Sequence, residues 1–161
     1  MTSPSSASPD GHGARLDAQS IRFERLLPGP IERVWAWLAD ADKRARWLAG
    51  GELPRQPGQT FELHFNHAAL TAETAPARYA QYDRPIVAHH TLLRCEPPRV
   101  LALTWGGAAG EAPSEVLFEL SEAGEQVRLV LTHTRLADRA AMLDVAGGWH
   151  AHLAVLAGKL A

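Results

Sequence analysis

The sequence predicts an α+β domain in which a curved antiparallel sheet packs against a long C-terminal helix, with two short helices after the first strand. Two observations predict this class. Apolar and polar residues alternate through most of residues 59–136, which is typical of strands with one buried face. The helical period then returns over residues 137–161, and no other predicted element is long enough to cover such a sheet.

Length, charge and cysteine content narrow the class of protein. The chain of 161 residues suits a single domain, which we place at residues 17–161, after a Ser- and Pro-rich tail at residues 1–16 that we expect to be disordered. Sixteen Lys and Arg residues against eighteen Asp and Glu residues argue against nucleic acid or a membrane surface as a partner. The lone Cys95 and the lack of a signal-peptide pattern predict a cytoplasmic location.

The first third of the domain holds a strand and two short helices. Residues 20–27 alternate as a strand, and residues 30–39 repeat Ile31, Val34, Trp35 and Leu38 at helical spacing. A second helix, capped by Asp40 or Asp42, is expected to end near residue 48. We expect Trp35 in the core and Trp37 partly exposed. Trp37 and Trp47 then form either a surface for a partner or a lid at the entrance of a cavity, with residues 44–51 as its rim.

The rest of the domain is predicted to be strands followed by the long helix. Strands are expected at residues 59–65, 85–95, 99–105 and in a pair over 114–136, whose hairpin turn has the sequence EAGE. Residues 66–83 show neither period and are expected to form a long loop. Gly147 and Gly148 interrupt the C-terminal helical pattern, which indicates a bend or a close contact at that point.

An ordered set of motifs resembles one known family. The motifs are PGPIERVWAWLAD followed by RWL, then CEPPRVLALTWG, SEVLFEL, and VRLVLTHTRLADR leading to AGGWHAHLAVL. They are similar to those of bacterial homologues of the activator of the 90-kDa heat-shock-protein ATPase. That family lies within the helix-grip superfamily, also called SRPBCC or START-like, with the major birch pollen allergen and polyketide cyclases. The resemblance implies a helix-grip fold over nearly all of residues 20–160. It does not imply a catalytic apparatus, because the superfamily includes binders, transfer proteins, enzymes and co-chaperones.

The resemblance also implies an apolar hollow between the sheet and the C-terminal helix that takes a hydrophobic ligand. Strand alternation and a helical step of about 100° per residue predict which side chains face this hollow. The expected ligand-binding residues are Phe61, Leu63, Phe65, His67, His89, Leu93, Leu103, Trp105, Phe118, Leu131, His133, Trp149, His152 and Leu153. His150 is expected on the flank of the helix, away from the sheet.

Three interpretations of the inward histidines stay open at this point. Each imidazole can complete a polar end of the core by bonding to a backbone carbonyl, a threonine or the Trp149 ring. Alternatively, several of them can surround one end of the cavity and donate hydrogen bonds to the polar head of a ligand, and this set is His67, His89, His133 and His152. A metal site is disfavoured because His150 and His152 point about 160° apart around their helix.

The sequence therefore predicts non-catalytic binding of a hydrophobic small molecule, with no cofactor, no metal and no catalytic residues. An interior filled by Phe61, Trp105, Phe118 and Trp149, with no void larger than a water molecule, would argue against it. One alternative, taken from the resemblance, is a co-chaperone-like module that binds a chaperone. Another is a cyclase- or hydrolase-type enzyme using His67, His89 or His133. A homodimer is possible on general grounds.

Overall fold

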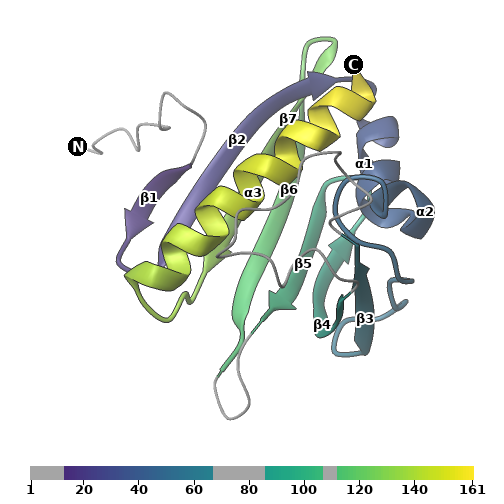
Figure 1. The fold of residues 1–161 in the computed structure, drawn as a ribbon. Coiled ribbons are helices and arrows are strands. Elements are labelled where there is room, and N and C mark those ends of the chain that lie inside the picture. Colours follow the sequence, from purple (N-terminus) through teal and green to yellow (C-terminus); the bar gives the residue numbers. More distant parts are fainter. Residues whose placement is uncertain (1–12, 67–85, 107–111) are drawn as a thin grey trace.

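One antiparallel sheet organises the protein. A computed structural model describes residues 13–66, 86–106 and 112–161 of the chain. In these residues seven strands follow the order β1-β2-β7-β6-β5-β4-β3, with β1 and β3 at the two edges (Figure 1). The strands are Ala14–Asp17 (β1), Ser20–Pro28 (β2), Thr60–Phe65 (β3), Ile86–Glu96 (β4), Val100–Trp105 (β5), Ser114–Ala123 (β6) and Gln126–Thr134 (β7).

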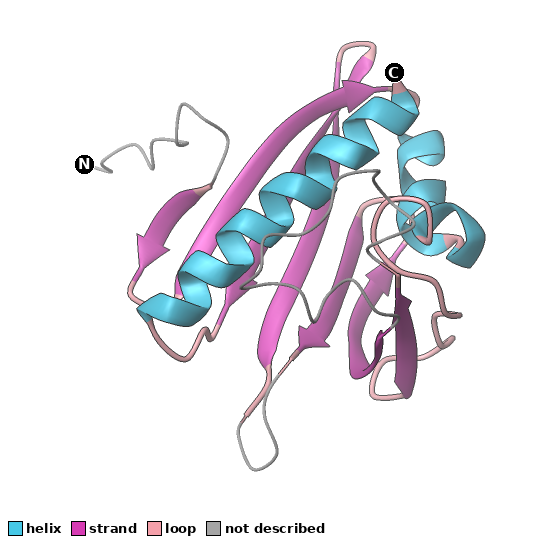
Figure 2. Cartoon of the chain, viewed as in Figure 1, coloured by secondary structure: helices cyan, strands magenta, loops and turns pink. Residues whose placement is uncertain are grey.

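The helices lie on one face of this sheet. The long helix α3, Arg139–Leu160, runs diagonally across that face, and the short helices α1, Ile31–Ala39, and α2, Ala41–Arg44, lie beside its C-terminal end (Figure 2). The predicted α+β helix-grip class is confirmed. Within the described residues, no helix is both long enough and apolar enough to cross a membrane.

Regular alternation places the inner side chains of β6 and β7 as predicted. Val116, Phe118 and Leu120 on β6 are buried, as are the four inner residues of β7, Val127, Leu129, Leu131 and His133. The two strands pair from Glu115↔Thr134 to Ala123↔Gln126, so that Gly124 and Glu125 form the predicted hairpin turn. Gly124 has a φ of 65°, a left-handed conformation that glycine adopts without strain.

Helix α3 begins at a capping aspartate and buries one face against the sheet. The Asp138 carboxylate accepts a hydrogen bond from the Ala141 N–H at 2.8 Å. The buried side chains of α3 are Met142, Ala146, Trp149, Leu153, Leu156 and Leu160. The close contact expected at Gly147 and Gly148 is wrong, because a Cβ added to either glycine would meet nothing within 4 Å, and α3 continues through both.

Strand β1 corrects the predicted N-terminal tail. Residues 14–16 were expected to be disordered, but they pair with β2, with Ala14 opposite Arg22 and Arg15 opposite Ile21. Ala14 is buried against the core, and this short strand covers the edge that β2 would otherwise expose. Residues 1–12 of the predicted tail, like the predicted loop at residues 67–83, lie outside the described residues.

The tryptophans of α1 exchange their expected places. Trp37 is buried and Trp35 is half-buried, whereas Trp35 is predicted in the core and Trp37 partly exposed. Measured around the helix from Val34, which is fully buried, Trp37 lies about 60° away and Trp35 about 100° away. Trp47 is also fully buried, so Trp37 and Trp47 do not form an exposed partner surface.

Strand β4 corrects the predicted orientation of two site residues. His89 is exposed and its neighbour His90 is buried, because Phe61 on the inner face of β3 pairs with His90. The register shifts between Leu92 and Arg94, which makes Leu93 the extra, half-buried residue of a bulge. After the bulge the alternation changes phase, so Cys95 packs against the core, whereas His89 and Leu93 were predicted wrongly.

Candidate ligand-binding site

Most of the predicted lining residues come together in one apolar interior. Nine of them are buried: Phe61, Leu63, Phe65, Leu103, Phe118, Leu131, His133, Trp149 and Leu153. Trp105 and His152 are half-buried, His89 and Leu93 lie as described above, and His67 is outside the described residues. The buried His90, which was not predicted, takes a place among these residues.

The interior contains a void much smaller than expected. A cavity of about 10 Å³ lies between the sheet and residues 38–53, and this is close to the smallest space that holds one water molecule. Its walls are Leu38, Arg44, Trp47, Leu48, Leu53, Phe61, Leu63, Leu101, Leu103, Trp105 and Phe118. No residue of α3 lines it. The predicted open hollow between the sheet and α3 is therefore not present in the described residues, and a void of this size is the result that argues against a preformed ligand site.

Aromatic rings fill the space beside this cavity. The Trp105 ring lies 4.9 Å from Trp149 and 5.1 Å from His90, measured between ring centroids. Phe65 packs edge-on against Trp105 at 5.8 Å, and Phe118 packs edge-on against Trp149 at 5.9 Å. Trp105 thus contacts both His90 on β4 and Trp149 on α3, and it is the half-buried member of an otherwise buried group.

His133 sits in a complete chain of hydrogen bonds. The Trp149 Nε1–H donates to His133 Nδ1 at 3.0 Å, and since an indole nitrogen can only donate, Nδ1 must be the unprotonated nitrogen. The neutral ring then carries its proton on Nε2 and donates to Ser114 Oγ at 2.7 Å. Ser114 Oγ in turn donates to the Trp105 carbonyl at 2.5 Å. Burial lowers the pKa of His133 from 6.5 to about 4, so the ring is neutral near pH 7.

The hydrogen bonds around His133 have the wrong polarity for a catalytic Ser–His pair. A serine nucleophile needs a histidine that accepts its proton, and the other ring nitrogen of that histidine usually donates to a carboxylate. Here Trp149 occupies Nδ1 as a donor, which leaves Nε2 protonated and unable to act as a base toward Ser114. Burial also raises the pKa of the Cys95 thiol, which disfavours the reactive thiolate.

His90 has the opposite arrangement and one unused nitrogen. Its Nδ1 lies 2.7 Å from the Thr104 carbonyl oxygen, and because a carbonyl can only accept, Nδ1 carries the proton. Burial lowers the pKa of His90, so the ring is neutral and Nε2 presents a lone pair. In the described part of the chain this buried Nε2 has no hydrogen-bond partner.

Arg44 is a buried side chain that holds residues 44–51, the rim beside the cavity, in place. The side chain is buried, and its guanidinium donates to the carbonyls of Leu38, Ala39, Ala49 and Gly51. Burial lowers its pKa to about 10, so it stays charged near neutral pH. Gly51, with a φ of 106°, lies so close to the Glu62 carbonyl that a Cβ would clash. Arg44 and Gly51 together hold residues 45–51 against β3.

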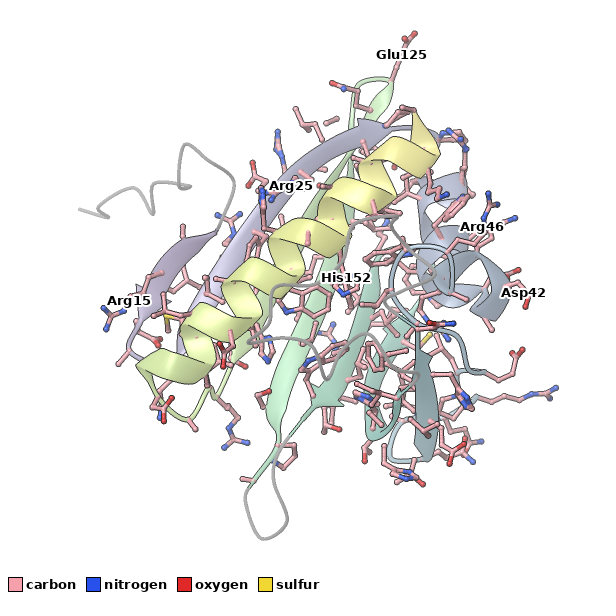
Figure 3. All side chains as sticks on the ribbon, viewed as in Figure 1. Arg15, Arg25, Asp42, Arg46, Glu125 and His152 are labelled. Atoms are coloured by element: carbon pink, nitrogen blue, oxygen red, sulfur yellow. The ribbon has the colours of Figure 1, made fainter. Side chains whose placement is uncertain are left out.

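His152 joins this rim to α3. Its Nδ1 lies 2.7 Å from the Trp47 carbonyl, so the imidazole donates from α3 to the segment after α2. Figure 3 labels the His152 side chain beside α3. The Trp47 indole N–H donates to the Trp37 carbonyl at 2.6 Å. His152 therefore points inward, as expected, although it is half-buried. Its hydrogen bond joins α3 to the segment that carries Trp47.

Sequence reasoning missed Arg44 and His90. The run KRARWL gives no signal that one arginine is buried, because the carbonyls that bind Arg44 come together only in the folded segment. His90 adjoins His89, so a strand read one residue out of phase chooses the wrong imidazole. Among the described residues, no group of three or more His, Cys, Asp or Glu side chains is arranged to hold a metal ion.

Comparisons with known proteins identify relatives of this chain. A family model described as "Activator of Hsp90 ATPase homolog 1-like protein" matches residues 28–161. No curated protein matches the chain. Among solved structures, the chain resembles the solution NMR structure of the protein encoded by gene BPP1335 from Bordetella parapertussis. The two share 98% sequence identity and a TM-score of 0.80, over 99% of this chain and 84% of that chain.

Two further structures are more distant. The crystal structure of CalU16 from Micromonospora echinospora is 27% identical with a TM-score of 0.65, over 94% of this chain and 78% of that chain. The solution structure of the Aha1 dimer from Colwellia psychrerythraea is 14% identical with a TM-score of 0.65, over 88% of this chain and 95% of that chain. The second likeness concerns the fold alone.

Proposed function

Because the chain belongs to the activator of Hsp90 ATPase homolog 1-like family, whose model covers residues 28–161, we propose that it binds a small apolar molecule in its interior without catalysis. The site that we propose lies between the inner face of β3, β5 and β6 and the rim formed by residues 44–53. The observation that carries the proposal is the apolar character of this place, where all the walls of the water-sized cavity except Arg44 are apolar side chains.

The void at rest is too small for an organic ligand, so binding requires the walls to move. Trp105 is the side chain that we expect to move, because it is half-buried and lies where β5 ends. Its ring contacts the rings of His90 and Trp149, which do not themselves line the cavity. Turning Trp105 away would join the cavity to the space that its indole fills, and the vacated volume would suit one aromatic ring.

Arg44 in the cavity wall and the Ser114–His133 pair next to Trp105 support a binder more than an enzyme. The Arg44 guanidinium is engaged by backbone carbonyls, and the Ser114–His133 pair has the polarity described above. Neither group offers a base or a nucleophile to a bound molecule. A homodimer stays a separate prediction, supported by the description of the Colwellia psychrerythraea relative as a dimer, and sedimentation velocity would test it.

Native mass spectrometry of the purified protein, beside a denatured sample, is the first experiment. A small molecule released only on denaturation would support the proposal and give the mass of the ligand. An NMR titration with toluene is the second experiment. We expect the methyl signals of Leu63 and Leu103, which line the cavity, to shift. The methyls of Leu117 supply the control, because this residue lies between the buried Val116 and Phe118 and therefore points to the opposite face of β6.

Two outcomes would contradict the proposal. If no copurified molecule is found and toluene near its solubility limit leaves the Leu63 and Leu103 methyls unchanged, the interior does not open to apolar molecules. If Leu117 shifts as much as Leu63 and Leu103, toluene binds to the surface of the sheet. Either result would return the interior to an ordinary packed core.

A further inference from the structure

We infer that the interior site selects a neutral aromatic molecule carrying a hydroxyl group, and that the hydroxyl donates a hydrogen bond to Nε2 of His90. This inference rests on the proposed function and names the ligand class for the same site. It differs from the sequence-based expectation, in which inward histidines donate to a polar head group. The difference follows from the tautomer that the neighbours of His90 impose.

The position of the His90 proton follows from one contact. The Thr104 carbonyl, 2.7 Å from Nδ1, has lone pairs and no hydrogen, so the proton of the neutral ring must lie on Nδ1. Thr104 also accepts, through its Oγ1, the backbone N–H of Thr91 at 2.8 Å, which holds β5 in place beside β4. Nε2 is then an acceptor, and a ligand that brings only acceptors cannot satisfy it.

His90 is buried, and among the described residues its Nε2 has no partner. His90 is 3% exposed, and in the described part of the chain Nε2 is among the buried side-chain nitrogen and oxygen atoms without a hydrogen-bond partner. Buried polar atoms in folded proteins are almost always paired, and an exception calls for an explanation such as an absent ligand. His133 shows that this interior can satisfy both nitrogens of a buried histidine when its neighbours supply the partners.

The surroundings of the His90 ring favour an aromatic body for the ligand. Phe61 lies 5.7 Å, Trp105 5.1 Å and Phe65 6.4 Å from the imidazole, measured between ring centroids. Phe61 and Trp105 also line the cavity, so a molecule that enters it would contact two of the three rings around His90. Aromatic molecules pack well against such ring faces and edges.

The same surroundings argue against an acid as the ligand. A carboxylate would direct its lone pairs at the lone pair of Nε2, and burying its charge is costly without a positive partner. The buried cation beside the cavity is Arg44, whose guanidinium is already used by four backbone carbonyls. A phenolic hydroxyl, in contrast, is neutral near pH 7 and provides the donor that Nε2 lacks.

Three matched probes test the inference: phenol, toluene and benzoate. Phenol and toluene have nearly the same shape, and phenol alone brings a donor. Affinities are measured by NMR titration of the wild-type protein, of His90→Phe, which keeps a ring but removes Nε2, and of His89→Phe. The His89→Phe control makes the same change at the exposed neighbour on the other face of β4.

We expect the preference for phenol over toluene to fall about tenfold in His90→Phe and to stay unchanged in His89→Phe, because one hydrogen bond is lost. Benzoate should show no binding at the concentrations at which phenol saturates the site. A second measurement needs no variant. In the wild-type protein, the ¹⁵N signal of His90 Nε2 should move on adding phenol and stay in place on adding toluene.

The outcomes separate this inference from the proposed function. If toluene and phenol both fail to shift the Leu63 and Leu103 methyls, the proposed function fails and the inference fails with it. If toluene binds but the preference for phenol is the same in the wild-type protein and in His90→Phe, the inference alone is overturned and a water molecule is the better partner for Nε2. Binding of benzoate as tight as that of phenol would also overturn it.

Discussion

His133 and His90 are both buried in the inner face of the sheet, and both are held neutral by burial, yet their partners differ. His133 has a donor at Nδ1 and an acceptor at Nε2, so it needs nothing further from the outside. His90 has an acceptor at Nδ1 and no partner at Nε2 in the described residues. Burial alone therefore does not show whether a histidine is fully satisfied by the core, whereas counting the partners of each ring nitrogen does.

Replacing each histidine in turn should give the largest change in the free energy of unfolding. The two changes should differ if His133 is fully satisfied and His90 is not. His133→Leu leaves the Trp149 N–H without an acceptor and breaks the bond to Ser114, so we expect the free energy of unfolding to fall by about 4 kcal/mol. His90→Leu removes one hydrogen bond, to Thr104, and should cost about 1 kcal/mol. Urea denaturation measures both.

His89→Leu is the control for these variants, because its side chain is exposed and a surface change should alter stability by less than about 0.5 kcal/mol. Equal losses for His133→Leu and His90→Leu would mean that the two histidines contribute alike to the core. In that case the unpartnered Nε2 of His90 would carry no special meaning.

The pH dependence of stability should show the second largest effect. The pKa of His133 is about 4 in the folded protein, against 6.5 for an unperturbed histidine, so the unfolded chain binds the proton more readily. The stabilisation that this residue gives is fully present above pH 6.5 and is lost as the pH falls from 6.5 to about 4. We expect the loss to reach about 3 kcal/mol.

Urea titrations from pH 7 to pH 4 check this expectation by comparing the wild-type protein with His133→Leu. The variant should be less stable throughout, but its stability should fall less steeply over this range. The pKa of His90 is lowered in the same direction, so His90→Leu should also flatten the curve. A wild-type curve parallel to that of His133→Leu would show that His133 titrates normally in the folded state.

Trp149→Phe should turn His133 into a histidine like His90. The change removes the N–H that donates to Nδ1 and leaves a buried acceptor without a partner, and it also reduces packing against Phe118. We expect a loss of about 2 kcal/mol in the free energy of unfolding. Without a donor that favours the neutral ring, the pKa of His133 should rise, which an NMR titration of its ring protons measures. A pKa that stays at about 4 would mean that burial alone lowers it.

Regular elements could be predicted from the sequence because their apolar patterns repeat over many residues. The inner face of β7 and the buried stripe of α3 repeat without a break over many residues, so a single error in phase would be visible in the pattern. The candidate site was predicted for Phe61, Leu63, Leu103, Trp105 and Phe118, which line the cavity. These residues lie on β3, β5 and β6, and neither the β3–β4 pairing nor the β5–β6 pairing has a register shift.

The remaining features depend on contacts that alternation does not encode. The bulge at Leu93 changes the phase within β4, and the doubled residues HH and LL hide the change. The burial of Arg44 depends on carbonyls that only the folded segment brings together. The tautomers of His90 and His133 depend on whether a carbonyl or an indole N–H lies beside Nδ1, and those partners come from other strands and from α3.

Gly147→Ala and Gly148→Ala should give the smallest effect, and they sharpen the comparison by changing neither histidine nor its partners. Both glycines are exposed within α3 and have open space where a Cβ would stand, so each change should raise the free energy of unfolding by about 0.5–1 kcal/mol. Ala151→Gly, at another exposed position of α3, is the matched control and should lower it by a similar amount. Urea denaturation of the three variants measures these differences.

A gain in stability from the two alanine changes would provide a more stable background in which His133→Leu stays folded and can be measured. A loss would mean that α3 needs flexibility beside Trp149, as a helix would if it had to move away from the sheet to admit a ligand.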